Sequence, residues 1–215
     1  MEGDGPLLAI CGGYQILGRQ WLWGDELVPG LGLIDMETRR PGTSADRLID
    51  NMVLESPLAA HPVVGYENHA GRTYLGEGVE GFGRVVSSCG HGNNDDDRVE
   101  GARYKNVVGT YSHGPLLSKN PEVADWLLAR ALERRAERTG TPAADLAPLD
   151  DSAELAANAP WSSACRRRRF NVDAPARRIR GEVVGNLPFS YGFSLVMGLI
   201  LLRRSAILCQ NVTSN

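Results

Sequence analysis

Apolar and polar positions along the first two-thirds of the chain alternate between short strand-like runs and longer helix-like stripes. The first run, Leu7–Ile10, is apolar throughout, which is typical of a strand in a parallel sheet buried on both faces. Cys11-Gly12-Gly13 follows it at once, and Tyr14–Trp23 carries apolar residues at helical spacing. The pattern therefore predicts a strand, a Cys-Gly-Gly turn and a helix.

The middle of the chain contains further extended segments. A polar stretch, Gly90–Asp97, predicts a loop, and it precedes two runs, Val99–Tyr104 and Val107–Tyr111. The pair Lys105-Asn106 separates these two runs as in a hairpin. The other segments that read as extended are Leu31–Thr38, Arg47–Leu54, His61–Tyr66 and Gly83–Ser88.

The clearest helix is expected from Pro121 to about Arg138. Asn120 can cap its start, Pro121 suits the first helical position, and Gly140 closes the helix. One face is apolar and consists of Val123, Leu127, Leu128, Ala131 and Leu132. Because strands and helices alternate along the chain, the expected fold class is α/β.

The last third of the chain differs from the rest. Residues 141–160 are rich in Ala, Asp and Pro, as in a linker, and the segment from Trp161 onward has a net charge of +7 against −10 for the residues before it. Leu187–Leu202 is apolar but shorter than the roughly 20 residues of a membrane-spanning helix. We therefore expect a domain at 1–139 and, at 140–215, a tail that is disordered or unrelated to it.

Composition narrows the class of protein. The chain has 215 residues, 42% of them hydrophobic, and a net charge of −3, which favours neither a nucleic-acid binder nor a strongly acidic protein. The four cysteines show no CxxC spacing, and no signal peptide precedes them. These features predict free thiols in the reducing cytoplasm.

Cys11 is the first candidate for chemistry. A nucleophile between a strand and a Gly-Gly that opens a helix occupies a sharp, strained turn. The helix N-terminus is expected to lower the thiol pKa, and the N–H of Gly12 can donate to an oxyanion. The alternative is a buried structural cysteine, which is the more common role of a lone Cys.

His113 is the candidate base, because it follows the run Val107–Tyr111 directly and strand ends collect active-site groups in open α/β sheets. A structural histidine remains the alternative, and His69 could line a pocket. A metal site would need other residues, namely His61, His69, His91 and Asp95–Asp97. Their spacing does not match a metal motif, and the glycine-rich loop at residue 90 lacks the lysine of a phosphate loop.

Several strings in the sequence resemble one enzyme family. Ala9–Gly18 (AICGGYQILG) resembles the nucleophile motif of the CobB/CobQ-like class I glutamine amidotransferases. A set of further strings is similar to one branch of that family, GatD, the glutaminase subunit of lipid II isoglutaminyl synthase. The set consists of Val64–Thr73 (VGYENHAGRT), Gly92–Asn94, Glu100-Gly101, Gly109–Leu117 (GTYSHGPLL) and Lys119–Asp125. The resemblance covers about residues 5–138 and implies a flavodoxin-like three-layer sandwich.

The resemblance also implies a reaction and a partner. Cys11 would attack the side-chain amide of glutamine, His113 would act as base, and Gly12 and Arg47 would bind the substrate. Pro115 occupies the position of the usual third, acidic residue. In this branch the Mur-ligase-like partner MurT forms a heterodimer with the glutaminase subunit. An aspartate of MurT takes the role of the third residue. The partner would use ATP and Mg to amidate the D-glutamate of lipid II to D-isoglutamine, in the cytoplasm or at the inner face of the membrane. No cofactor or metal is implied for this chain, and no nucleic acid.

Two departures from the family lead to two alternatives. The chain starts one strand before the nucleophile, whereas such domains normally begin with further strands, and residues 140–215 match nothing in the family. We therefore expect an N-terminally truncated domain with little or no glutaminase activity alone. One alternative is the amidotransferase domain of cobyric acid or cobyrinate a,c-diamide synthesis. The second is an inactive, truncated binding module.

Overall fold

The computed structural model describes residues 4–23, 25–41, 46–86, 89–114 and 116–167. All of these belong to the first of two units, Met1–Phe170, and the second unit is Asn171–Asn215. Pro115 and the apolar stretch at 187–202 lie outside the described residues. No helix in the described part of the chain is both long and apolar enough to cross a membrane.

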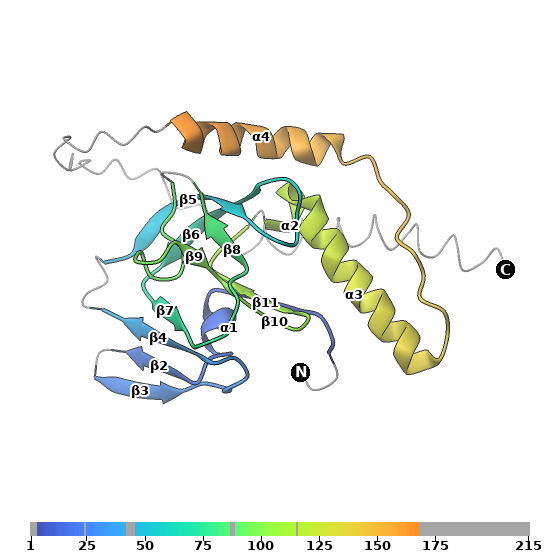
Figure 1. Ribbon diagram of the computed structural model, residues 1–215. Coiled ribbons are helices and arrows are strands. Elements are labelled where there is room, and N and C mark those ends of the chain that lie inside the picture. The colour runs from blue at the N-terminus through green and yellow to red at the C-terminus, as the bar shows by residue number, and fades with distance from the viewer. Residues whose placement is uncertain (1–3, 24, 42–45, 87–88, 115, 168–215) are drawn as a thin grey trace, which may run out of the picture. The chain divides into compact units, whose positions relative to one another are not determined.

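The fold of this unit is α/β, with its described strands in three small sheets (Figure 1). Their strand orders are β1-β11-β10, β3-β2-β4-β7 and β6-β5-β8-β9. The bounds are β1 Leu7–Ile10, β2 Gln20–Trp23, β3 Glu26–Pro29, β4 Met36–Arg40, β5 Leu48–Glu55, β6 Val63–His69, β7 Arg72–Leu75, β8 Gly83–Val85, β9 Val99–Glu100, β10 Ala102–Tyr104 and β11 Val107–Thr110. The helices are α1 Gly12–Gln15, α2 Leu116–Lys119, α3 Pro121–Thr139 and α4 Ser152–Arg167.

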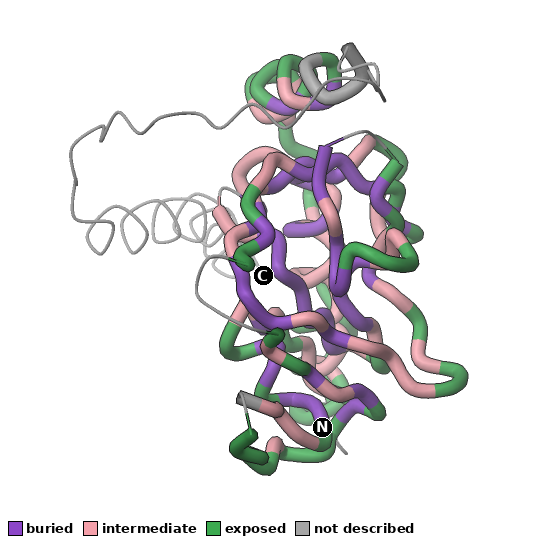
Figure 2. Tube along the Cα trace, turned by 90° about the vertical axis from the view of Figure 1, so that its left-hand side faces the viewer, coloured by how far each residue is buried: buried purple, intermediate pink, exposed green. Residues whose placement is uncertain are grey.

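The strand buried on both faces is β11, at the centre of the first sheet, and all four of its residues are buried. Figure 2 colours the buried residues of the described chain purple. Val107 packs into one hydrophobic cluster and Val108 into another, because successive side chains of a strand point to opposite faces. β1 pairs with β11 in parallel, as expected, but only Ala9 of β1 is fully buried. The prediction of two-sided burial was therefore wrong for β1, which is an edge strand.

Gly109 in β11 has no room for a side chain. A Cβ at this position would overlap the ring of Tyr14, which is fully buried. We expect Gly109→Ala to lower the free energy of unfolding by about 1 to 3 kcal/mol, because a crowded core must shift to admit the methyl group. Urea unfolding measures this effect, and Gly5→Ala, where a Cβ would meet nothing within 4 Å, is the control. Equal stability of the two variants would contradict the packing described.

The helix after Cys11 is shorter than predicted. It ends at Gln15, and Gln20–Trp23 forms β2, so the expectation of a helix up to Trp23 was wrong. The carbonyls of Ile16 and Leu17 accept hydrogen bonds from a later segment, with Leu31 N to Ile16 O at 2.8 Å. Those contacts end the helix, and the aromatic-rich sequence Gln-Trp-Leu-Trp favours a strand.

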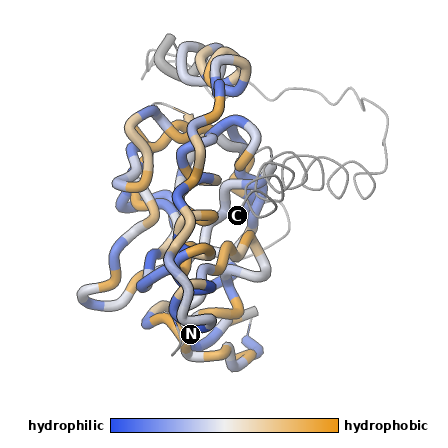
Figure 3. Tube along the Cα trace, turned by 90° about the vertical axis from the view of Figure 1, so that its right-hand side faces the viewer, coloured by the Kyte–Doolittle hydropathy of each residue, from blue (hydrophilic) through white to orange (hydrophobic). Residues whose placement is uncertain are grey.

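The same contacts explain a second error, since Leu31–Thr38 was expected to be extended throughout. The amides of Leu33 and Ile34 both donate to Leu17 O, so this segment folds back on α1 and β4 begins only at Met36. Several large apolar side chains between residues 16 and 33 stay exposed: Ile16, Leu27, Val28, Leu31 and Leu33. Figure 3 colours the hydrophobic positions along the trace orange.

The predicted hairpin is divided between two sheets. β10 and β11 pair in antiparallel fashion, as expected, but β9 pairs with β8 instead. Gly101 separates β9 from β10 with a φ of 65°, and a Cβ there would overlap the carbonyl oxygen of Gly109. Glycine is needed at this position because other residues rarely adopt this backbone conformation. β5 and β6 lie close to their predicted segments, whereas β8 ends at Val85.

The long helix α3 lies where the sequence predicts it, and Gly140 ends it with a φ of 66°. Two details differ. The side chain of Asn120 does not cap the helix but holds the start of β6 through Val64, accepting from its N–H and donating to its carbonyl, both at 2.8 Å. In the predicted apolar stripe only Val123 is fully buried, and Ala131 is exposed.

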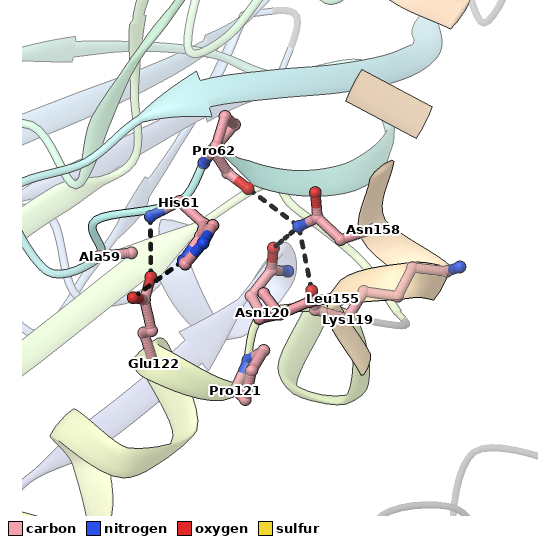
Figure 4. Close-up of a pocket in the computed structure, with 9 residues that line it drawn as sticks. All are labelled: Ala59, His61, Pro62, Lys119, Asn120, Pro121, Glu122, Leu155 and Asn158. Atoms are coloured by element: carbon pink, nitrogen blue, oxygen red, sulfur yellow. Dashed lines mark hydrogen bonds and ion pairs between the residues drawn. The ribbon is translucent and has the colours of Figure 1, made fainter. Parts of the chain in front are cut away.

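The segment expected to be a linker contains a helix, α4, which starts at Ser152. Its Asn158 is buried and donates to Pro62 O, Lys119 O and Asn120 Oδ1 at 2.9 to 3.1 Å (Figure 4). These bonds lie in a shallow hollow between the start of β6, the junction of α2 with α3, and α4. The linker prediction was therefore wrong for residues 152–160, which pack against the domain.

Cysteine chemistry also differs from the expectation. Cys89 is disulfide-bonded, while Cys11 is free. The prediction that all cysteines are free thiols was therefore wrong for Cys89.

Candidate active site

Cys11 occupies the turn between β1 and α1, and its backbone is strained. Its φ of 54° and ψ of −112° are unusual for a residue with a side chain. Two backbone hydrogen bonds hold it there, since Cys11 N donates to Thr110 O and Gln15 N donates to Cys11 O, both at 2.9 Å. The sharp turn that the sequence predicts at the candidate nucleophile is therefore present.

The Cys11 thiol is half-buried, and this burial raises its pKa above the ordinary value. A hydrogen bond from the N–H of Gly12 and the positive charge of Arg47 lower the pKa in part. We had expected the helix N-terminus to make the pKa low. That expectation was wrong, because α1 has only four residues and desolvation of the thiolate outweighs these two effects.

Gly12 follows Cys11 and opens α1. It is exposed, and a Cβ added to it would meet nothing within 4 Å. Its N–H lowers the pKa of the Cys11 thiol as a hydrogen-bond donor. A backbone donor beside the nucleophile is one of the groups that can stabilise an oxyanion.

His113 lies at the same end of the first sheet as Cys11. The parallel register pairs Ile10 with Thr110, so the residues that follow each strand emerge side by side. Burial lowers the pKa of His113, and the positive charge of Arg47 lowers it further, so the ring is neutral at pH 7. No hydrogen bond within the described residues joins its ring to the Cys11 thiol.

Arg47 precedes β5 and is bound to the neighbouring strand. Its Nε donates to Asn68 Oδ1 and a terminal nitrogen donates to Asn68 O, both at 2.8 Å. Its charge lowers the pKa of both Cys11 and His113. The structure thus brings Arg47 into the electrostatic environment of the two candidate catalytic groups.

A buried polar layer beneath these residues was not predicted. The Tyr111 ring stacks on His69 at 3.6 Å, and its hydroxyl accepts from Gln15 Nε2 at 3.0 Å. Gln15 belongs to α1, which carries the Cys11 turn, so Tyr111 connects the turns that bear the two candidate groups. The sequence does contain a signal for part of this layer: Glu67 and His69 alternate with the half-buried Tyr66 and Asn68, and period-2 spacing places them on the same face of β6 as the buried Val63.

The histidines considered for a metal site have other partners. His61 Nδ1 lies 3.1 Å from Glu122, His69 Nδ1 donates to Gly71 O at 2.7 Å, and His91 Nδ1 donates to Glu67 at 2.5 Å. His69 is buried and does not line the hollow shown in Figure 4. In the part of the chain that the structure describes, no three acidic, histidine or cysteine side chains group as a metal site would require.

The family model for the CobB/CobQ-like glutamine amidotransferase domain matches residues 1–121. GatD of Staphylococcus aureus (strain N315) is 45% identical over 136 residues, covering 63% of this chain and 53% of that protein. GatD of Streptococcus pneumoniae (strain ATCC BAA-255 / R6) is 37% identical over 136 residues, covering 63% and 51%. Both carry the name lipid II isoglutaminyl synthase (glutamine-hydrolyzing) subunit GatD.

The cobyric acid synthase of Pelotomaculum thermopropionicum is 38% identical over 148 residues, covering 63% of this chain and 27% of that protein. The chain spans about half the length of the GatD relatives that it matches. The matched family segment contains Cys11, Gly12, Arg47 and His113. The chain belongs to the CobB/CobQ-like glutamine amidotransferase domain family.

Proposed function

We propose that this domain hydrolyses glutamine and supplies the ammonia to a synthetase partner. The observation that carries the proposal is the parallel pairing of β1 with β11, which places Cys11 and His113 at one sheet end with the charge of Arg47 acting on both. A nucleophilic thiol, a neutral imidazole and a backbone N–H are the groups that acyl transfer from an amide requires.

In the proposed mechanism the resting thiol and the resting imidazole are both neutral, because burial disfavours the charged form of each. The sulfur of Cys11 attacks the amide carbon of glutamine while His113 accepts the thiol proton. The Gly12 N–H donates to the oxyanion, and His113 returns the proton to the departing ammonia. Water, deprotonated by His113, then hydrolyses the glutamyl thioester to glutamate.

The proposal extends to the acceptor of the ammonia. The support for lipid II D-glutamate as the acceptor is the 45% identity to GatD of Staphylococcus aureus, whereas GatD of Streptococcus pneumoniae, at 37%, and the cobyric acid synthase of Pelotomaculum thermopropionicum, at 38%, are equally similar to the chain. A Mur-ligase-like partner of the MurT kind would then activate the carboxylate with ATP and Mg²⁺, in the cytoplasm or at the inner membrane face. Amidation of corrinoids is the second candidate, because cobyric acid synthases match the same segment.

The proposed domain architecture is the flavodoxin-like three-layer sandwich of class I amidotransferases. The parallel pair β1 and β11, with Cys11 after the first strand and His113 after the second, supports it. The boundary between a domain at 1–139 and a tail at 140–215 also stays a prediction.

The test combines the chain with a Mur-ligase-like partner, ATP, Mg²⁺ and glutamine, and offers either lipid II or a cobyrinate acceptor. We expect glutamate to form together with D-isoglutamine in lipid II, and no amidated corrinoid. Amidation of the corrinoid alone would favour the second candidate. Absence of glutamate formation with the partner present would favour a binding module and contradict the proposed activity.

Arg47 provides a separate prediction for substrate binding and electrostatics. Arg47→Gln removes a positive charge that lowers the pKa of both Cys11 and His113, so both pKa values should rise. It also removes the proposed partner of the glutamine carboxylate, and KM should increase about tenfold, since a hydrogen bond to a charged group contributes about 1.5 to 3 kcal/mol. The pH dependence of Cys11 alkylation and the KM for glutamine measure the two effects. Arg47→Lys, which keeps the charge, should leave both pKa values close to those of the unmodified chain.

A further inference from the structure

The turn that leads from β11 to His113 is held by side-chain acceptors where strand pairing stops. The N–H of Tyr111 donates to Glu100 Oε1 at 2.8 Å, and the N–H of Ser112 donates to Thr110 Oγ1 at 2.9 Å. The hydroxyl of Thr110 in turn donates to the same Glu100 oxygen. The carboxylate of Glu100 is thus connected to Thr110 and Tyr111 directly, and to Ser112 through Thr110.

Glu100 is fully buried, and its second oxygen, Oε2, has no hydrogen-bond partner among the described residues. Burying a carboxyl group with one unpaired oxygen is costly, and such groups persist where they serve a specific purpose. The two hydrogen bonds that Glu100 accepts both come from the start of the His113 turn. The proposed reaction uses Glu100 for no chemical step, so its burial there calls for another role.

The next residue, His113, is fixed by a backbone carbonyl of β6. His113 N donates to Tyr66 O at 2.7 Å, and its Nδ1 lies 3.3 Å from the same oxygen. Because a carbonyl can only accept, this contact favours the neutral tautomer with its proton on Nδ1, which leaves a free lone pair on Nε2. The backbone of Tyr111 is a second hydrogen-bond partner of the ring. The Nε2 lone pair is the group able to accept a proton from a thiol.

The neighbouring strand fits this turn closely. Ser112 is fully buried against Gly65 of β6, and a Cβ on Gly65 would overlap the Ser112 hydroxyl. The turn therefore has little room to shift along β6 without losing the contact between His113 and Tyr66.

We propose that Glu100 is a positioning residue for His113, acting through Thr110 and the Tyr111 amide to hold the ring on the Tyr66 carbonyl with Nε2 free. The proposal rests on the proposed role of His113 as base. Its ring geometry, however, can be measured without any reaction.

The most suitable variants are at Thr110, which is fully buried. Thr110→Val keeps the shape of the side chain but removes the link between Glu100 and the Ser112 amide. Thr110→Ser keeps the hydroxyl and should therefore keep the link between Glu100 and the Ser112 amide. Glu100→Gln keeps an acceptor oxygen and should behave like Thr110→Ser. Ser56→Ala is the matched control, because it removes the buried hydroxyl that donates to Phe82 O, outside this turn.

The first measurement is imidazole nitrogen NMR of His113 in the full chain. We expect the Nδ1–H tautomer in the unmodified chain and in Thr110→Ser and Glu100→Gln, and a mixture of tautomers in Thr110→Val. The second measurement is glutamine hydrolysis with the ligase partner. There kcat of Thr110→Val should fall about tenfold or more with KM changed less than about twofold, as expected when a reacting group is misaligned.

Two results would overturn the proposal: His113 signals that are the same in Thr110→Val as in the unmodified chain, or an equal disturbance in Ser56→Ala. A tautomer change that occurs in Thr110→Val but not in Ser56→Ala would support the proposal. If that change occurs but the unmodified chain hydrolyses no glutamine with its partner, the positioning role stands and the proposed function fails.

Discussion

Replacing Cys11 with glycine is expected to abolish glutamine hydrolysis while making the protein more stable than the Cys11→Ala variant. Glycine normally destabilises a fold relative to alanine by about 0.5 to 1 kcal/mol. At Cys11 the order should reverse, because φ of 54° and ψ of −112° strain any residue with a Cβ. Relief of this strain should add about 1 kcal/mol or more to the free energy of unfolding.

Both Cys11 variants lack the sulfur, and we expect each to lose glutaminase activity by at least about a thousandfold, because no other group can form the thioester. Urea unfolding gives the stability difference. Ala9→Gly, in the adjacent strand, is the control. It should lower the free energy of unfolding relative to the unmodified chain, as a change from alanine to glycine normally does. A Cys11→Gly variant less stable than Cys11→Ala would mean that the turn is not strained.

The second large effect is expected at His113. His113→Gln removes the base and should lower kcat by about 10² to 10⁴-fold, the usual contribution of a positioned base. His91→Gln is the control, since His91 is half-buried and bound to Glu67 but is not among the candidate catalytic groups. We expect this control to keep most of its glutaminase activity.

The pH dependence follows from the direction of the His113 pKa shift. A base acts in its neutral form, and burial lowers the pKa of this ring, so the neutral form persists as the pH falls to about 6.5, the ordinary value for histidine. Activity should decline only at more acidic pH, and His113→Gln should lack this decline. If kcat/KM already declines at a pH above about 6.5, the ordinary pKa of histidine, the result would contradict a base whose pKa is lowered by burial.

Local sequence patterns predicted the positions of several elements and candidate groups. The apolar run before Cys11, the hairpin segment before His113 and the capped helix at Pro121 all depend on residues close together in the chain. Their locations could therefore be predicted. Whether Cys11 and His113 act in catalysis stays a prediction.

The errors all concern properties that distant residues determine. The helix after Cys11 ends early because residues 31–34 donate to the carbonyls of residues 16–18, which directly follow it. The Cys11 pKa depends on burial by the whole fold, which the helix argument did not include. The binding of Asn158 to the loop at Pro62 and to Lys119 could not be anticipated from a segment that resembles a linker. The buried pair Glu67 and His69 was predictable in part from the alternation along β6.

The most direct test of the account is covalent labelling by a chloroketone analogue of glutamine, followed by peptide mass spectrometry of the full chain with its ligase partner. The account predicts a single adduct on Cys11, prevented by excess glutamine and absent from Cys11→Ala. An unlabelled Cys11, or labelling that excess glutamine does not prevent, would contradict the assignment of Cys11 as the glutamine-hydrolysing nucleophile.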